Sequence, residues 1–110
     1  MPVYAVPSLS PEVERAINVL GANAARLAVL GFIARHPGSL VSEIAEGTGL
    51  AVGTVKIHVS ALTALEVLDP DPAVSVPYAD RRGRHTRYTA RVDALTAHYR
   101  DLGKLLGLTK

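Results

Sequence analysis

The sequence predicts one small, mainly helical α+β domain, and three observations support this class. The chain has 110 residues, which suffice for one domain and leave no room for two. Apolar residues recur at helical spacing over most of its length. Between about residues 73 and 90, apolar and polar residues instead alternate on either side of a glycine, which is typical of a β-hairpin.

The composition narrows the class of protein. Hydrophobic residues make up 48% and charged residues 20%, within the range of folded globular chains. The longest apolar run, residues 27–34, is much shorter than the roughly 18 residues of a membrane span. The first ten residues have no basic start and no long apolar run, so we expect no secretory signal. The chain has no cysteine, which excludes disulfides and thiolate chemistry and makes the cytoplasm the default location.

Two helices are expected in the first third of the chain. Residues 1–9 are rich in proline and predict an N-terminal arm, followed by the domain proper over residues 10–110. Ser10 before a proline is typical of a helix N-cap, and Gly21 ends that helix. A second helix begins after Asn23 and runs to about residue 36, because a Pro-Gly pair follows. Its apolar residues surround the axis, so we expect it at the centre of the domain.

A helix-turn-helix unit is expected over about residues 42–67. Ser42 can cap a short helix, and Gly49 tolerates the positive φ of a tight turn before a longer helix. A short helix, a glycine turn and a longer helix are what a DNA-reading unit requires. We expect Ala45 to be the small residue where the two helices cross and Leu50 to fill the gap between them. Val55 is expected to pack inward from the second helix.

A hairpin and a final helix are expected to complete the chain. Alternation over residues 74–78 and 86–90 predicts a two-stranded β wing spanning about residues 73–90. The last helix, about residues 92–106, carries apolar residues at spacings of three and four, typical of a short dimerisation seam. The seam consists of Val92, Leu95, Tyr99, Leu102 and Leu106. The order of these elements is that of a winged helix-turn-helix.

Two segments carry a resemblance to a known family. TVKIHVSAL, residues 54–62, resembles the T-V-S-x-H-L-x-x-L of ArsR-like winged-helix repressors, and EIAEGTGLAVGTV, residues 43–55, is similar to their E-L-A-x-x-L-G-L-S-x-x-T-V. The resemblance covers about residues 24–106, and MarR-like regulators share much of the pattern. It implies DNA binding, with His58 at the family's histidine position in a structural role, bonding backbone or phosphate. It does not imply metal sensing, because the Cys-x-Cys motif of metal-sensing members is missing.

The beginning of the longer helix is the first candidate DNA contact. A recognition helix enters the major groove by its N-terminal part. Lys56 can reach a guanine or a phosphate, and Val52 can contact a thymine methyl group. The alternative is that this helix docks another protein through its apolar start. The candidate residues are Ala51, Val52, Gly53, Thr54, Lys56, Ile57 and Ser60.

The expected wing is the second candidate DNA contact. The net charge is only +2, but residues 56–110 carry nine Lys and Arg against six acidic residues. Guanidinium groups on a loop suit phosphates and the narrow minor groove of A·T-rich DNA, whereas the alternative is a solvated charged loop. The candidate residues are Arg81, Arg82, Arg84, His85 and Arg87.

These features predict a sequence-specific, double-stranded DNA-binding transcriptional regulator that acts as a homodimeric repressor. The seam on the last helix would form the dimer, or would instead pack within the chain's own core. Two other functions stay open: a phage or plasmid accessory factor for excision, partition or replication, and a protein-interaction module. We expect no enzyme, metal or cofactor, because no acid, base and pocket assemble along the sequence. We also expect no membrane partner, and a small-molecule effector is left open.

Overall fold

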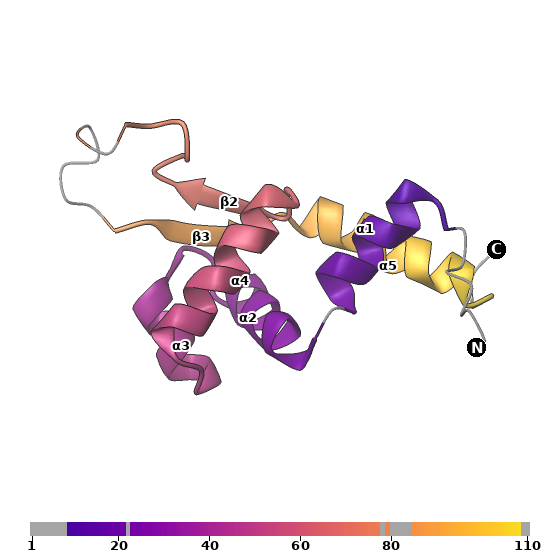
Figure 1. Ribbon diagram of the computed structural model, residues 1–110, viewed down its shortest axis with the longest axis horizontal. Coiled ribbons are helices and arrows are strands. Elements are labelled where there is room, and N and C mark those ends of the chain that lie inside the picture. Colours follow the sequence, from indigo (N-terminus) through magenta and orange to yellow (C-terminus); the bar gives the residue numbers. More distant parts are fainter. Residues whose placement is uncertain (1–8, 22, 78, 80–84, 109–110) are drawn as a thin grey trace, which may run out of the picture.

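The computed structural model describes residues 9–21, 23–77, 79 and 85–108, and its architecture is a winged helix-turn-helix (Figure 1). In Figure 1, α1 and α5 cross at one end of the molecule, and the other elements form the opposite end. The elements in chain order are α1 Pro11–Leu20, α2 Ala24–Arg35, β1 Ser39–Leu40, α3 Val41–Thr48, α4 Val52–Ala64, β2 Leu68–Asp71, β3 Arg87–Ala90 and α5 Val92–Leu105.

The first two helices begin at the predicted caps. The Ser10 hydroxyl accepts a hydrogen bond from the Val13 amide at 3.2 Å, which satisfies one of the free amides of the first turn of α1. The Asn23 side chain does the same for the Arg26 amide at 2.7 Å and starts α2. Both helix starts are therefore confirmed, and α2 also lies at the centre of the core as predicted.

Helix α3 starts differently from the prediction. Ser42 is not its N-cap but lies inside the first turn, because the helix begins at Val41. The Leu40 amide instead donates to the Glu43 carboxylate at 2.8 Å, so a glutamate one turn into the helix supplies the capping interaction. The end of α3 is as predicted: Gly49 has a φ of 75°, a conformation that glycine adopts without steric cost.

Helix α4 ends at Ala64, earlier than the expected residue 67. Glu66 adopts a left-handed φ of 64° and reverses the chain, with its amide donating to the Thr63 carbonyl at 3.0 Å. The two residues after this reversal, Val67 and Leu68, are buried in the core. Because the chain turns into the core at these two residues, strand β2 begins only a few residues after the end of α4.

The sheet corrects the expectation of a two-stranded wing. It has three antiparallel strands in the order β1-β3-β2, because the two residues of β1 pair with β3. The first strand of the wing is β2, paired as Leu68 with Ala90 and Asp71 with Arg87, whereas residues 74–77, expected in that strand, lie beyond it. β2 is an edge strand, where the proline at position 70 is tolerated despite its missing N–H.

The core lies between α2, α3, α4 and the sheet, with one residue from α1. The predicted small residue at the helix crossing, Ala45, is only partly buried. Among the glycines that the structure describes, the closest approach is at Gly47, where a Cβ atom would lie 2.1 Å from a ring carbon of Phe32 on α2. The buried core residues are Val19, Val29, Leu30, Ile33, Ile44, Val55, Val59, Leu62, Val67 and Leu68.

Helix α5 divides the predicted apolar seam between two faces. Leu95 packs against the core, and no described residue of α5 is fully buried. Val92, Tyr99 and Leu106 are 65%, 72% and 68% exposed, so much of the seam faces away from the chain's own core. Helix α5 packs mainly against α1.

Among the described residues, no single helix is long and apolar enough to cross a membrane. Only α1 and α2 taken together have the length and apolar composition of a membrane span, and the two helices are bent by 84° relative to each other.

Candidate nucleic-acid interface

Helix α4 buries one face and exposes the other. Its inner face, Val55, Val59 and Leu62, packs in the core behind the helix. The residues predicted as DNA contacts lie on the open side, where Thr54 is partly exposed and the others are exposed. These exposed residues are Ala51, Val52, Gly53, Lys56, Ile57 and Ser60.

The open face of α4 is positive and largely apolar. The helix contains no acidic residue, and Lys56 forms no ion pair with any residue that the structure describes. Val52 and Ile57 are 46% and 67% exposed, so this face carries two aliphatic side chains in water. Ala51, at the N-cap position, offers no side-chain acceptor to the first amides of α4. The positive end of the helix dipole therefore faces solvent without a neighbouring carboxylate on α4.

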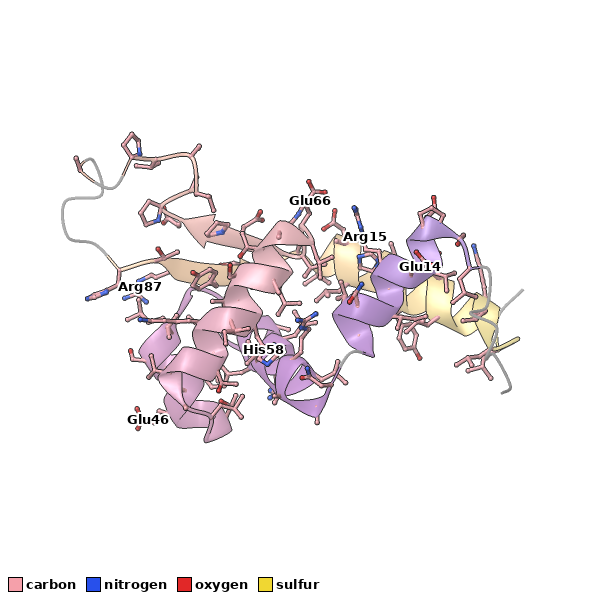
Figure 2. The ribbon with its side chains drawn as sticks, viewed as in Figure 1. Glu14, Arg15, Glu46, His58, Glu66 and Arg87 are labelled. Carbon is pink, nitrogen blue, oxygen red and sulfur yellow. The ribbon has the colours of Figure 1, made fainter. Side chains whose placement is uncertain are left out.

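His58, labelled in Figure 2, connects α4 to the N-terminal helices. The Arg26 Nε donates to the His58 Nδ1 at 3.3 Å, and another guanidinium nitrogen of Arg26 donates to the Asn18 carbonyl at 3.1 Å. One arginine on α2 thus contacts both α4 and α1. The sequence indicated a structural role for His58 with backbone or phosphate as its partner; in the structure the partner of its Nδ1 is a side chain 32 positions away.

Burial lowers the pKa of His58 below its ordinary value of 6.5, and the positive charge of Arg26 lowers it further. The folded state therefore holds the neutral imidazole, whose Nδ1 accepts from Arg26. Below pH 6.5 the unfolded chain takes up a proton that the folded chain resists, so the free energy of unfolding falls as the pH falls. The contribution of His58 to the free energy of unfolding is present in full above pH 6.5. It is lost as the pH falls to the pKa that His58 has in the folded state.

We expect urea unfolding of the wild type to show this loss between pH 7.5 and pH 5. A His58→Gln variant keeps an acceptor for Arg26 but cannot titrate, so its free energy of unfolding should change less over the same interval. An equal pH dependence in both proteins would contradict the role assigned to His58.

The wing candidates divide into two groups. Arg81, Arg82 and Arg84 lie outside the described residues, and His85 is exposed. Arg87, in contrast, makes contacts within the chain: a guanidinium nitrogen donates to the Gly38 carbonyl at 3.0 Å and lies 3.8 Å from a carboxylate oxygen of Glu43. These contacts join β3 to the start of α3. Its side chain remains about half exposed.

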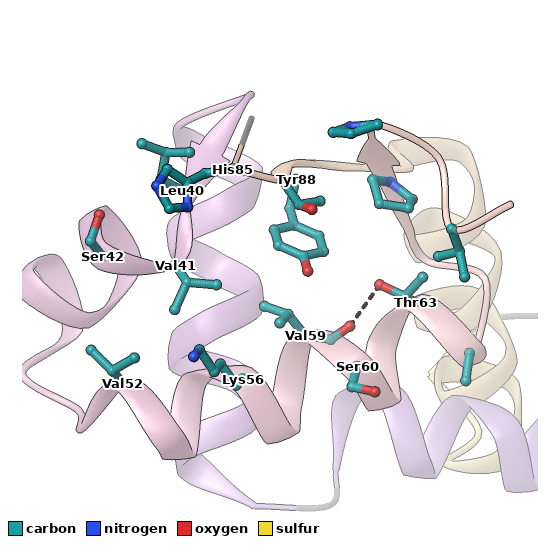
Figure 3. A pocket seen from close by; sticks show the side chains of 15 residues that line it. Leu40, Val41, Ser42, Val52, Lys56, Val59, Ser60, Thr63, His85 and Tyr88 are labelled. Atoms are coloured by element: carbon teal, nitrogen blue, oxygen red, sulfur yellow. Dashed lines mark hydrogen bonds between the residues drawn. The ribbon is translucent and has the colours of Figure 1, made fainter. Parts of the chain in front are cut away.

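A groove separates α4 from the wing (Figure 3). It has a volume of about 1020 Å³, and fifteen of the described residues line it, from β1 and the start of α3, from α4 and from both sides of the wing. Four of the predicted DNA contacts, Val52, Lys56, Ser60 and His85, line it. This groove could not be predicted from the sequence, because it forms only where four separate segments between residues 40 and 88 come together.

No metal site accompanies these features within the described part of the chain. His, Asp and Glu residues form no group of three that could hold a metal ion there.

Comparisons with known proteins agree with the fold. Residues 26–72 match the family model of the IclR helix-turn-helix domain. NolR from Sinorhizobium fredii is similar in structure, with a TM-score of 0.58 and 19% identity over 94% of this chain and 100% of that one. MepR from S. aureus, solved as a complex with DNA, has a TM-score of 0.54 and 12% identity over 86% of this chain and 75% of that one.

A search of curated proteins found no match. The matching family model describes an IclR-type domain, so the ArsR-like resemblance stays a prediction.

Proposed function

We propose that this chain is a transcriptional regulator that binds double-stranded DNA through α4 and the wing. The observation that carries the proposal is the open face of α4. It has no acidic residue, its Lys56 forms no ion pair within the described part of the chain, and it belongs to a segment matching a helix-turn-helix model. In this arrangement the second helix enters the major groove of DNA. The similar MepR structure is a complex with DNA, which supports the same use of the fold here.

Base reading by α4 would rest on a small set of side chains. Lys56 reaches a guanine edge or a phosphate, and the hydroxyl groups of Thr54 and Ser60 bond to either. Val52 and Ile57 would contact thymine methyl groups, the apolar feature of the major groove. The wing would add backbone contacts, with Arg81, Arg82 and Arg84 on phosphates or in the minor groove.

A homodimer explains the exposed apolar residues at the α1 and α5 end. Val92, Tyr99 and Leu106 would remain in water in a monomer, and Ile17 of α1 is also partly exposed. A two-fold dimer through this face would present two α4 helices to successive major grooves, about 34 Å apart. The occupied operator would exclude other proteins from the promoter, which is repression in the cytoplasm where the DNA lies.

Selection of binding sites from a random pool of duplexes tests this proposal. We expect enrichment of an inverted repeat whose half-sites are about 10 base pairs apart, because two related α4 helices read them. If the protein retains duplexes from the pool but no sequence is enriched among them, sequence-specific reading is contradicted.

A dimer variant serves as the control for this selection. Tyr99→Glu/Leu106→Glu places two charges on the exposed face of α5 and should leave the fold intact, because neither side chain lies in the core. We expect this variant to sediment as a monomer and to lose its preference for two half-sites over one. A variant that stays dimeric would place the interface elsewhere.

A protein-interaction module is the second candidate function, favoured by the exposed Val52 and Ile57 at the start of α4. Such a module would bind DNA weakly and with little dependence on salt. A phage or plasmid accessory factor would protect a tandem array of sites rather than one inverted repeat.

A further inference from the structure

Helix α1 meets the rest of the chain mainly through α5, at the end of the molecule away from the wing (Figure 1). Val19 is the one residue that α1 contributes to the buried core. Arg15 of α1 lies 4.0 Å from the carboxylate of Glu66, but both side chains are more than half exposed, and such surface pairs contribute little. Each directional contact between α1 and the part of the chain around α4 therefore matters for the angle between these two helices.

Arg26 of α2 makes directional contacts to both helices. Its Nε donates to Nδ1 of His58 on α4 at 3.3 Å, and its Nη1 donates to the Asn18 carbonyl of α1 at 3.1 Å. His58 is only 7% exposed, so water competes little for the first bond. Asn18 belongs to the last turn of α1, where the carbonyls of an α-helix need partners from outside the helix.

Arg26 lies where the rules for a single helix disfavour a positive charge. It is the third residue of α2, at the positive end of the helix dipole, and the first turn of α2 contains no acidic residue. Helix α1, in contrast, has no basic residue in its own last turn, where a positive charge is favourable. The Arg26 guanidinium supplies that charge at the Asn18 carbonyl. The partners on α1 and α4, rather than its own helix, therefore account for an arginine at this position.

We propose that Arg26 is a positioning residue for DNA binding, which fixes the angle between α1 and α4 through its hydrogen bonds to both. In the proposed dimer, α1 and α5 form the end where the two chains meet, so this angle sets the separation and relative rotation of the two α4 helices. A stiff joint restricts the dimer to one spacing of half-sites, whereas a soft joint spreads binding over several. The role in DNA binding rests on the proposed function, whereas the fixed angle does not.

A distance between two spin labels tests the angle in the full chain without DNA. The chain has no cysteine, so labels attach only at Glu12→Cys on α1 and Gly53→Cys on α4. Both positions are exposed, and no atom lies within 4 Å of a Cβ added at Gly53. Dilution with unlabelled chain restricts double electron–electron resonance to label pairs within one chain. We expect one narrow distance distribution with Arg26 present and a distribution about twice as wide in Arg26→Leu, because both directional contacts are lost.

Three variants control this measurement. Arg35→Leu removes the same charge from the exposed far end of α2 and should leave the distribution unchanged. His58→Gln keeps an acceptor for Arg26 and should keep the narrow distribution, whereas His58→Leu removes the acceptor and should broaden it. His58→Leu also decides the question if Arg26→Leu does not fold. Distributions that stay narrow in the folded Arg26→Leu and His58→Leu proteins, or that broaden equally in Arg35→Leu, would overturn the proposal.

Duplexes with different half-site spacings test the consequence for DNA binding. The measurement is the anisotropy of inverted repeats whose half-sites are about 10 base pairs apart, together with duplexes shortened or lengthened by single base pairs. We expect the affinity of the wild type to fall about tenfold for each single-base-pair change, and that of Arg26→Leu to fall about twofold or less. Both proteins should bind a single half-site equally, because Arg26 does not belong to the open face of α4.

The outcomes separate this inference from the proposed function. If the chain binds no duplex, the proposed function fails, and the label distances still decide whether Arg26 fixes the angle. If Arg26→Leu broadens the distances but keeps the sharp preference for one spacing, the role in DNA binding is wrong. If Arg26→Leu loses the same affinity for a single half-site as for every spacing, Arg26 supports the reading surface rather than the angle, and the proposal is overturned.

Discussion

Replacing Gly47 with alanine is expected to destabilise the protein by about 1–3 kcal/mol, although alanine is the better helix former. A Cβ atom at this position would lie 2.1 Å and 2.7 Å from two ring carbons of Phe32. That ring cannot move away without loss, because it packs against the core and contacts the His36 ring in a tilted arrangement, with ring centroids 4.4 Å apart. Urea unfolding followed by circular dichroism measures the effect.

Two variants give this prediction its controls. Gly53→Ala adds the same methyl group to α4, where no atom lies within 4 Å, and should leave stability unchanged or raise it by up to about 1 kcal/mol. Phe32→Leu in the Gly47→Ala background shortens the obstructing side chain and should recover part of the loss. A Gly47→Ala protein as stable as the wild type would show that α2 and α3 do not approach as closely as described.

Removing the three wing arginines together is expected to have the largest effect on DNA binding. Arg81→Ala/Arg82→Ala/Arg84→Ala should lower the affinity for a 30-base-pair duplex by about two to three orders of magnitude at 0.1 M salt. The reason is counterion release: each phosphate contact contributes about 0.9 to the slope of log K against log salt. Fluorescence anisotropy across a salt series measures both the affinity and the slope.

A variant with the same loss of charge elsewhere is the matched control. Arg15→Ala/Arg35→Ala/Lys104→Ala removes three positive charges from α1, α2 and α5, and none of these residues is a candidate DNA contact. We expect this protein to keep most of the wild-type slope. Equal losses in the two triple variants would mean that net charge, rather than the wing, drives binding.

Features determined by neighbouring residues were predictable from the sequence. Ser10 and Asn23 each accept a hydrogen bond from an amide three positions later, and Gly49 provides a left-handed turn between two helices. Such interactions depend on local residue types, so the starts of α1 and α2 and the turn between α3 and α4 could be placed in advance. The open face of α4 also followed, since helical periodicity assigns its inward residues.

Features determined by distant residues were not predictable. β1 has only two residues, too few for an alternating pattern, and β2 contains a proline that a sequence pattern counts against a strand. The alternation of apolar residues predicted a strand over residues 74–78. The strand that pairs with β3 is instead β2, whose register places the buried Leu68 opposite Ala90. The contact of Gly47 with Phe32 and the groove depend likewise on how separate elements pack.

DNA binding by the wild-type protein is the most direct test of the central claim. The measurement is anisotropy of a labelled, random-sequence 30-base-pair duplex, titrated with the protein at several salt concentrations. We predict binding at low salt and a slope of log K against log salt of about −3 or steeper, from Lys56 and the three wing arginines. No binding at low salt, or an affinity that salt does not change, would contradict the account and favour a role in protein docking.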